Sequence, residues 1–203
     1  MKAEANKKTA TILVKIKGSN PSPVEVCHYL ANRPNSSGFD QIIEHESKFK
    51  HFGPDNEPPK SFDNGYGICQ LTIPPPSFEQ LWNWKLNLDG GLKLFETKRL
   101  AAIIYLSQDN RTCTSDQLTH EAVCRWNGGS YRDWDKKSGQ WVRPTNILCD
   151  LRTGNIGWDM NDPDNAGKTE AELHQRDGSS YSKRPCGAKW KYSGVCYADR
   201  VLG

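Results

Sequence analysis

The sequence predicts an α+β protein that is predominantly helical, with its β structure gathered near the C-terminal end. Apolar residues recur at helical spacing through the first 130 of the 203 residues. The longest periodic segment, residues 86–108, predicts the central helix of the core. After residue 130, short alternating segments separated by turn residues replace this pattern. We therefore expect a helical body followed by a lobe that contains β-hairpins.

The chain divides into four expected parts. Residues 1–22 contain a strand and the turn "GSNPSP", and we interpret them as a linker from an upstream region. Residues 23–130 form the helical body, and residues 131–190 form a Trp-rich lobe of hairpins and loops. Residues 191–203 supply a last helix that returns to the body.

Capping residues and apolar spacing locate the individual elements. Ser22 is a candidate N-cap with Pro23 at the first helical position, and Ser77 caps a later helix. Turn signals at Ser138-Gly139 and Thr153-Gly154 predict one or two hairpins. The first expected helix starts at residue 23, the second covers about 39 to 50, and the third starts at 78. The fourth covers 86–108 and the fifth runs from 114 or 115 to 127. The last two cover "KTEAELHQR" and "SGVCYADRVLG".

Composition narrows the classes of partner. Hydrophobic residues make up 35% of the chain and no run of 18 apolar residues occurs, so we expect no membrane partner. The 27 basic residues are spread among 24 acidic ones, which does not favour a nucleic-acid partner. The first residues lack the apolar region of a signal peptide. Two interpretations of the chain remain, a cytosolic protein and a domain of a larger secreted protein, and we favour the second. We expect the chain to be a monomer.

Seven cysteines leave at least one thiol unpaired. Cys186 and Cys196 could close a short loop if the chain reaches an oxidising compartment. Alternatively, most of the thiols are free and buried as small apolar groups.

Three motifs follow one another in an informative order. "HESKF" (residues 45–49) ends a helix, "GYGICQLT" (65–72) follows a Gly/Pro loop, and "AVCRWNGGSY" (122–131) ends a later helix. Between them lies "NLDGGLKLF", and "CYADRV" stands near the C-terminus. Together they resemble the soluble lytic transglycosylase and goose-type lysozyme superfamily over residues 38–130 and the last ten. The arrangement also looks like muramidase domains of bacterial antagonism effectors, including those exported by type VI secretion.

The resemblance implies a lysozyme-like fold in which Glu46 is the general acid. Cleavage of the MurNAc-GlcNAc β-1,4 bond of peptidoglycan needs a protonated carboxyl beside the leaving oxygen. A carboxyl at a helix end, flanked by Ile and Phe, lies where desolvation favours its protonated form. Glu44 and His45 point to other sides of this helix and are expected at the surface or in support.

The resemblance also implies substrate-binding residues, and most of them have a structural alternative. The expected set is Ser47, Tyr66, Gln70, Thr72, Asn127 and Tyr197. Ser47 either orients Glu46 or caps its own helix, and Gln70 either binds the glycan or holds its own loop. Asn127 either contacts the site or ends a helix, and Tyr197 lies beside the acid or packs in the core.

The second chemical step distinguishes two products. A lysozyme needs a carboxylate that activates water, whereas a lytic transglycosylase uses the C6 hydroxyl of its substrate. In goose-type lysozymes an Asp stands where this chain has Thr72, so Asp63 is the remaining candidate for a second catalytic carboxylate. Alternatively, Asp63 shapes the "DNGYG" turn.

The lobe offers a candidate metal site and several aromatic rings. Asp159, Asn161, Asn165 and Glu170 have the outline of a calcium loop, but Pro163 and Asp164 depart from its pattern. The alternative is an acidic turn that caps the next helix. We expect no required cofactor, with Ca²⁺ as the one candidate ion. Of Trp134, Trp141, Trp158 and Trp190, we expect one to line a glycan groove and the others to fill cores.

These expectations combine into one functional hypothesis and one rival. The hypothesis is a cell-wall-lysing antibacterial effector domain that acts in the bacterial periplasm on peptidoglycan strands and has an immunity protein as a partner. The rival is a catalytically silent peptidoglycan-binding module with the same fold.

Overall fold

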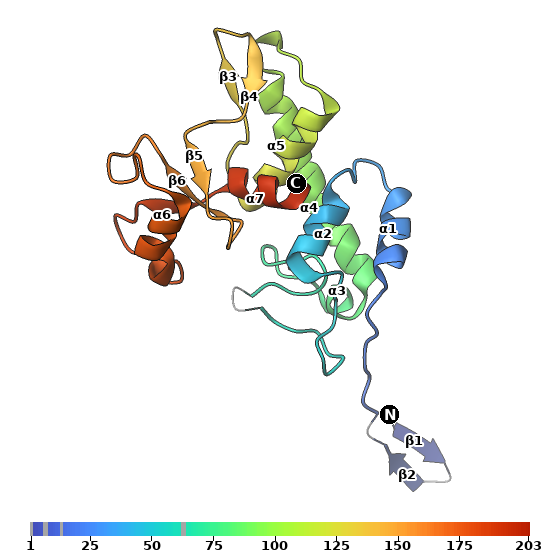
Figure 1. The fold of residues 1–203 in the computed structure, drawn as a ribbon. Coiled ribbons are helices and arrows are strands. Elements are labelled where there is room, and N and C mark those ends of the chain that lie inside the picture. The colour runs from blue at the N-terminus through green and yellow to red at the C-terminus, as the bar shows by residue number, and fades with distance from the viewer. Residues whose placement is uncertain (1, 6–7, 13, 62–63) are drawn as a thin grey trace.

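The computed structural model describes residues 2–5, 8–12, 14–61 and 64–203, and these form a mainly helical α+β structure (Figure 1). The helices are α1 (Pro23–Ala31), α2 (Phe39–Ser47), α3 (Phe78–Trp82), α4 (Trp84–Leu106), α5 (Ser115–Asn127), α6 (Glu170–Asp177) and α7 (Gly194–Leu202), with 3₁₀ turns η1 (Gln108–Asn110) and η2 (Gly178–Ser180). The strands are β1 (Lys2–Ala5), β2 (Lys8–Thr11), β3 (Asp133–Asp135), β4 (Gln140–Val142), β5 (Ile147–Cys149), β6 (Ile156–Asp159) and β7 (Trp190–Tyr192). The predicted α+β class is confirmed.

Helix starts follow the capping signals in the sequence. Ser22, Ser77, Thr114 and Thr169 each accept a hydrogen bond from the backbone N–H three residues later, in complete capping boxes. The end of α2 differs from the prediction. This helix stops at Ser47 instead of residue 50, because the next two residues adopt left-handed backbone conformations.

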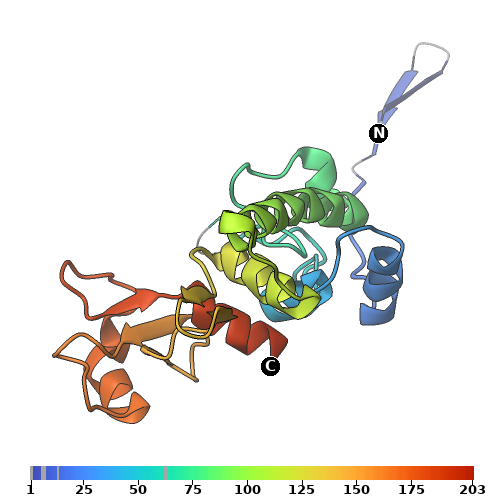
Figure 2. The same cartoon turned by 90° about the horizontal axis from the view of Figure 1, so that it is seen from above.

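The helical body is built around α4. This helix packs against α3 and α5, while α7 lies along α5 and also contacts α2, as Figures 1 and 2 show. Gly194 permits the close approach of α7 to α5, because a Cβ at this position would lie 2.0 Å from the carbonyl oxygen of Gly128. Phe39 stacks on Phe95 at the centre of the core, with ring centroids 5.3 Å apart. The last helix is therefore part of the body's core.

The lobe has a separate small core. Strands β5, β6 and β7 form an antiparallel sheet, and β3 pairs with β4, so a hairpin is present at each of the two turn signals. Trp158 and Trp190 pack with Ile156 and Leu173 between this sheet and α6. The strand β7 begins at Trp190, so residues 191 and 192 belong to the lobe and not to the last helix.

A disulfide and an ion pair join the lobe to the body. Cys149 of β5 is bonded to Cys196 of α7, so the suggested Cys186–Cys196 loop is wrong. Arg143 donates hydrogen bonds to both carboxylate oxygens of Asp199 on α7, at 3.0 and 2.6 Å to Oδ2. Cys186 is free and exposed. The last helix is thus held by the lobe as well as by α5.

The N-terminal strands β1 and β2 pair antiparallel and extend away from the body in both views. An extended segment then leads to α1 (Figure 1). Among the described residues, no helix is both long and apolar enough to cross a membrane.

Candidate active site

Glu46 lies on the inward face of α2, near the end of that helix. Ile42 and Ile43, which precede Glu46 by four and three residues, are fully buried, and this spacing directs Glu46 toward the same side. Glu44 is exposed, as expected for a residue on another face of the helix. The helix therefore anchors Glu46 at the edge of the apolar core.

Tyr197 contacts Glu46 directly. Its hydroxyl donates a hydrogen bond of 2.6 Å to Glu46 Oε1, and the Tyr197 side chain comes from α7. Burial, together with the neighbouring Glu46 carboxylate, raises the pKa of Tyr197, so the phenol stays neutral and keeps its proton for donation. The His45 ring packs edge-on against Tyr197 with centroids 5.1 Å apart, and burial lowers the pKa of His45.

A cavity of about 210 Å³ opens beside Glu46. Its polar lining comes from Glu46, Gln70, Thr72 and Asn127. The rest of the lining is mainly apolar and consists of Cys69, Leu71, Leu94 and Trp126. The structure thus brings four of the predicted site residues together from the end of α2, the following loop and the end of α5.

The remaining predicted residues lie elsewhere or have other roles. Ser47 Oγ donates to the carbonyl of Ile43 at 3.1 Å, which is the local capping alternative. Tyr66 is not among the residues that line the cavity, and its backbone pairs with Leu71. Asp63 lies outside the described residues. Among the described residues that line this cavity, Glu46 is the only acid.

Gln70 combines both of its predicted roles. Its side-chain amide Nε2 donates to the carbonyl of Gly67 at 2.8 Å, so it holds its own loop, and the residue also lines the cavity. Its φ of 49° is left-handed, a conformation that an L-residue adopts only where the surroundings fix it. The loop is therefore tightly constrained where it faces the cavity.

His51 and Asn87 hydrogen-bond to the backbone of this loop, and neither is among the predicted site residues. The His51 ring is fully buried; its Nδ1 accepts from the N–H of Ile68, and its Nε2 donates to the carbonyl of Leu81. Burial lowers the pKa of His51 to about 4, so the ring is neutral near pH 7. Asn87 on α4 accepts from the N–H of Cys69 at 3.0 Å. These two side chains satisfy buried loop amides that would otherwise have no partner.

A second cavity meets the first at Asn127. It has a volume of about 480 Å³ and lies between the end of α5 and the lobe. Its lining includes the charged side chains of Asp133, Asp159 and Lys191, with Asn146 and Tyr192. Gly128 and Gly129 border this cavity, and both have a positive φ that favours glycine.

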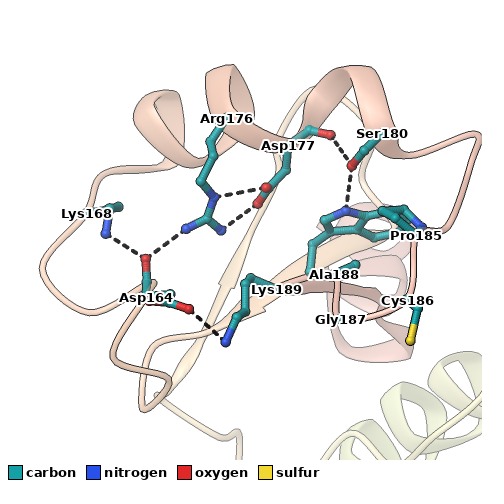
Figure 3. A pocket seen from close by; sticks show the side chains of 11 residues that line it. Asp164, Lys168, Arg176, Asp177, Ser180, Pro185, Cys186, Gly187, Ala188 and Lys189 are labelled. Atoms are coloured by element: carbon teal, nitrogen blue, oxygen red, sulfur yellow. Dashed lines mark hydrogen bonds and ion pairs between the residues drawn. The ribbon is translucent and has the colours of Figure 1, made fainter.

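The predicted calcium loop is cross-linked by protein cations. Lys189 forms ion pairs with Asp162 and Asp164, and Arg176 donates to the Asp164 carbonyl, as Figure 3 shows for Asp164. Asn165 is fully buried, with its amide bonded to the carbonyls of Asp159 and Lys189 and to Arg176.

The other predicted calcium ligands also have separate environments. Asp159 Oδ1 accepts from Asn146 and from the N–H of Asn161, whereas the carboxylate of Glu170 lies beside Asp150 and His174. Lys189 pairs with the intervening Asp162 and Asp164, and Asp159 and Glu170 have different partners, so the geometry favours the helix-capping turn over Ca²⁺ in this loop.

The tryptophans of the lobe mainly fill cores. Trp141, Trp158 and Trp190 are buried, and Trp134 is half-buried beneath the Arg111 guanidinium, 4.6 Å from its ring centroid. None of the four lines the Glu46 cavity. The tryptophan that does is Trp126 of α5.

No family model matches this chain, and it has no match among curated proteins or solved structures. The functional assignment therefore depends on the motifs and on the geometry around Glu46.

Proposed function

We propose that this chain is a muramidase that cleaves the MurNAc-GlcNAc β-1,4 bond of peptidoglycan with Glu46 as general acid. The observation that carries the proposal is the hydrogen bond from buried Tyr197 to Glu46 at a cavity that also contains Gln70, Thr72 and Asn127. A carboxyl that is anchored on a helix, held by one donor and open to a polar cavity is suited to proton transfer. The same motif order supports a lysozyme-like fold for the body.

In the first step, Glu46 gives its proton to the oxygen that leaves with GlcNAc. The bond between this oxygen and C1 of MurNAc then breaks, and positive charge develops on the MurNAc ring. Because Tyr197 holds Oε1, the other carboxyl oxygen is the one we assign as the proton carrier. The carboxylate that results keeps the Tyr197 hydrogen bond, which is stronger to a charged acceptor.

In the second step, either water or the C6 hydroxyl of MurNAc attacks C1. In the intramolecular case, Glu46 takes the hydroxyl proton and is restored, and the product is a 1,6-anhydro ring. In the hydrolytic case, a second carboxylate activates the water. Asp63 remains our candidate for that role.

The substrate strand is proposed to run from the Glu46 cavity past Asn127 into the second cavity. The two cavities share this residue, and the second one presents amide, hydroxyl and charged groups that suit sugar hydroxyls or stem-peptide charges. Two of its charged lining residues are exposed, Lys191 on β7 and Asp133 on β3. The lobe would then contribute to binding of the polymer.

The setting of this activity is also proposed to be the bacterial periplasm, with delivery as part of a larger secreted protein and inhibition by an immunity protein. The Cys149–Cys196 disulfide supports an oxidising destination, because such bonds persist in the periplasm and are rare in the cytosol.

The proposal is tested by clearing of purified cell-wall material in a zymogram at pH values between about 4 and 8. We expect the natural protein and Glu44→Gln to clear the substrate and Glu46→Gln to leave it intact. Glu44 is a matched control because it is an exposed acid on the same helix. Binding to cell walls without clearing at any pH would instead assign the chain to a silent binding module.

A further inference from the structure

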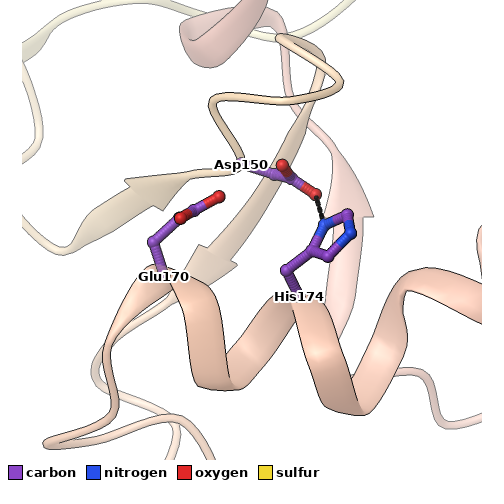
Figure 4. A group of neighbouring side chains, drawn as sticks. All are labelled: Asp150, Glu170 and His174. Carbon is purple, nitrogen blue, oxygen red and sulfur yellow. Dashed lines mark hydrogen bonds and ion pairs between the residues drawn. The ribbon is translucent and has the colours of Figure 1, made fainter.

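Three side chains of the lobe converge away from the Glu46 site. Asp150 begins the β5–β6 turn, Glu170 is the first residue of α6, and His174 follows one helical turn later on the same face (Figure 4). One oxygen of each carboxylate and one ring nitrogen all lie within 4.8 Å of one another. Figure 4 shows the three side chains directed toward a common point between the turn and the helix.

The Asp150 carboxylate is buried and fixed in orientation. Its side chain is 0% exposed, and Oδ1 accepts from the backbone N–H of Arg152 at 2.9 Å. Its Oδ2 accepts from the Tyr181 hydroxyl at 2.8 Å and faces His174 Nδ1 at 2.7 Å. Outer partners of this kind orient the ligands of metal sites.

Glu170 provides the second, independent observation. Its Oε1 atom is buried and receives no hydrogen bond from any described residue. No described Lys or Arg forms an ion pair with either Asp150 or Glu170. A buried carboxylate oxygen beside another buried carboxylate is costly unless a cation is present.

A cavity borders this group of side chains. Asp150 and Glu170 both line a space of about 460 Å³ that also borders the Cys149–Cys196 disulfide. Arg143 lines the same space, but its guanidinium is bonded to Asp199. The cavity therefore reaches the β5–β6 turn and the start of α6, the two segments that carry Asp150 and Glu170.

We propose that Asp150, Glu170 and His174 bind a divalent transition metal, with Zn²⁺ as the ion that suits the site best. Two carboxylates and one imidazole match the ligand set of Zn²⁺, with a fourth position left to water. Ca²⁺ and Mg²⁺ are disfavoured because both prefer an all-oxygen set. The bound metal joins the β5–β6 turn to α6. The site does not depend on the proposed activity of Glu46.

The test is titration of the whole chain with ZnCl₂ by calorimetry, with Co²⁺ as a spectroscopic probe. The exposed thiols, which also bind zinc, are first alkylated with iodoacetamide. We expect one saturable site in the natural chain and in Glu172→Gln, and a loss of affinity of more than about tenfold in Glu170→Gln and in His174→Gln. Glu172 is the matched control because it is an exposed acid on the same helix, two residues from Glu170.

Thermal unfolding separates loss of binding from loss of folding. Addition of Zn²⁺ should raise the melting temperature of the natural chain and of Glu172→Gln. It should leave the melting temperature of folded Glu170→Gln unchanged. Absence of saturable binding in the natural chain would overturn the proposal. Unchanged affinity in both site variants, or a Co²⁺ spectrum with thiolate charge transfer, would do the same.

Discussion

Tyr197 and Glu46 are 151 positions apart in the sequence, yet the tyrosine hydroxyl lies 2.6 Å from the glutamate oxygen Oε1. The contact joins the last helix to the helix that carries the proposed acid. Because α7 is also attached to the lobe by the Cys149–Cys196 disulfide, the lobe, the last helix and the site form one connected unit. The proposed chemistry therefore depends on residues far from Glu46.

Replacement of Tyr197 by Phe should reduce both activity and stability. The hydroxyl donates to a carboxylate in a mostly buried setting, so its loss should cost about 1.5–3 kcal/mol of unfolding free energy. Cell-wall turnover should fall by about 10-fold or more, because the orientation of the acid is lost. Tyr29→Phe is the control, since its hydroxyl also donates to a carboxylate, that of Asp89, but the residue lines neither of the two cavities. Equal effects of the two changes would contradict the role given to Tyr197.

His51 should make stability depend on pH. Its pKa is about 4 in the folded chain and about 6.5 when unfolded, so below pH 6.5 the unfolded chain binds the proton more readily. Its contribution is complete above pH 6.5, declines as the pH falls toward 4 and is lost below that. Between pH 7 and pH 5, the loss should be about 2 kcal/mol. Denaturant unfolding of the natural chain and His51→Gln at both pH values checks this, and equal pH slopes would contradict it.

The disulfide should stabilise the chain and support the site. Its ends are 47 positions apart, and closure of a loop of this size is worth about 4 kcal/mol in the chain-entropy picture. The double substitution Cys149→Ser and Cys196→Ser should lower the melting temperature and the cell-wall turnover together. The matched control is Cys27→Ser with Cys113→Ser, which replaces two exposed free thiols. A double variant of the disulfide with full turnover would show that α7 stays in place without it.

Lys191 tests whether the second cavity binds substrate. This exposed residue lines the cavity on β7, and its replacement by Ala should change stability by less than about 0.5 kcal/mol. We expect weaker binding to long glycan strands and unchanged turnover of the shortest fragments that are cleaved. Lys136→Ala, at the exposed β3–β4 turn, serves as the control. Identical strand binding by both variants would remove this cavity from the proposed path.

Local signals in the sequence predicted most of the secondary structure. Ser22, Ser77 and Thr114 carry complete capping information within four residues, and the helices begin where these residues predict. The end of α2 was placed three residues too late because Phe49 continued the apolar spacing after the backbone had turned. A periodic pattern does not reveal a left-handed residue.

Contacts between distant residues were harder to predict. The resemblance drew attention to Glu46, Gln70, Thr72 and Asn127, which share a cavity, and to Tyr197, which contacts Glu46. Composition and spacing alone would not have paired them. The pairing of Cys149 with Cys196 and the contact of His51 with the loop depend on how the chain folds back on itself, and no local pattern specifies that.

The most direct test of the central claim is mass spectrometry of purified peptidoglycan after digestion with the natural chain and with Glu46→Gln. We predict soluble muropeptides from the natural chain and none from the variant, which should remain folded because an amide is similar in size to the carboxyl. Products with 1,6-anhydro ends would identify a lytic transglycosylase, and reducing muramic ends would identify a lysozyme. Intact glycan after digestion by the natural chain, or equal products from a folded Glu46→Gln variant, would contradict the assignment of Glu46 as the catalytic acid.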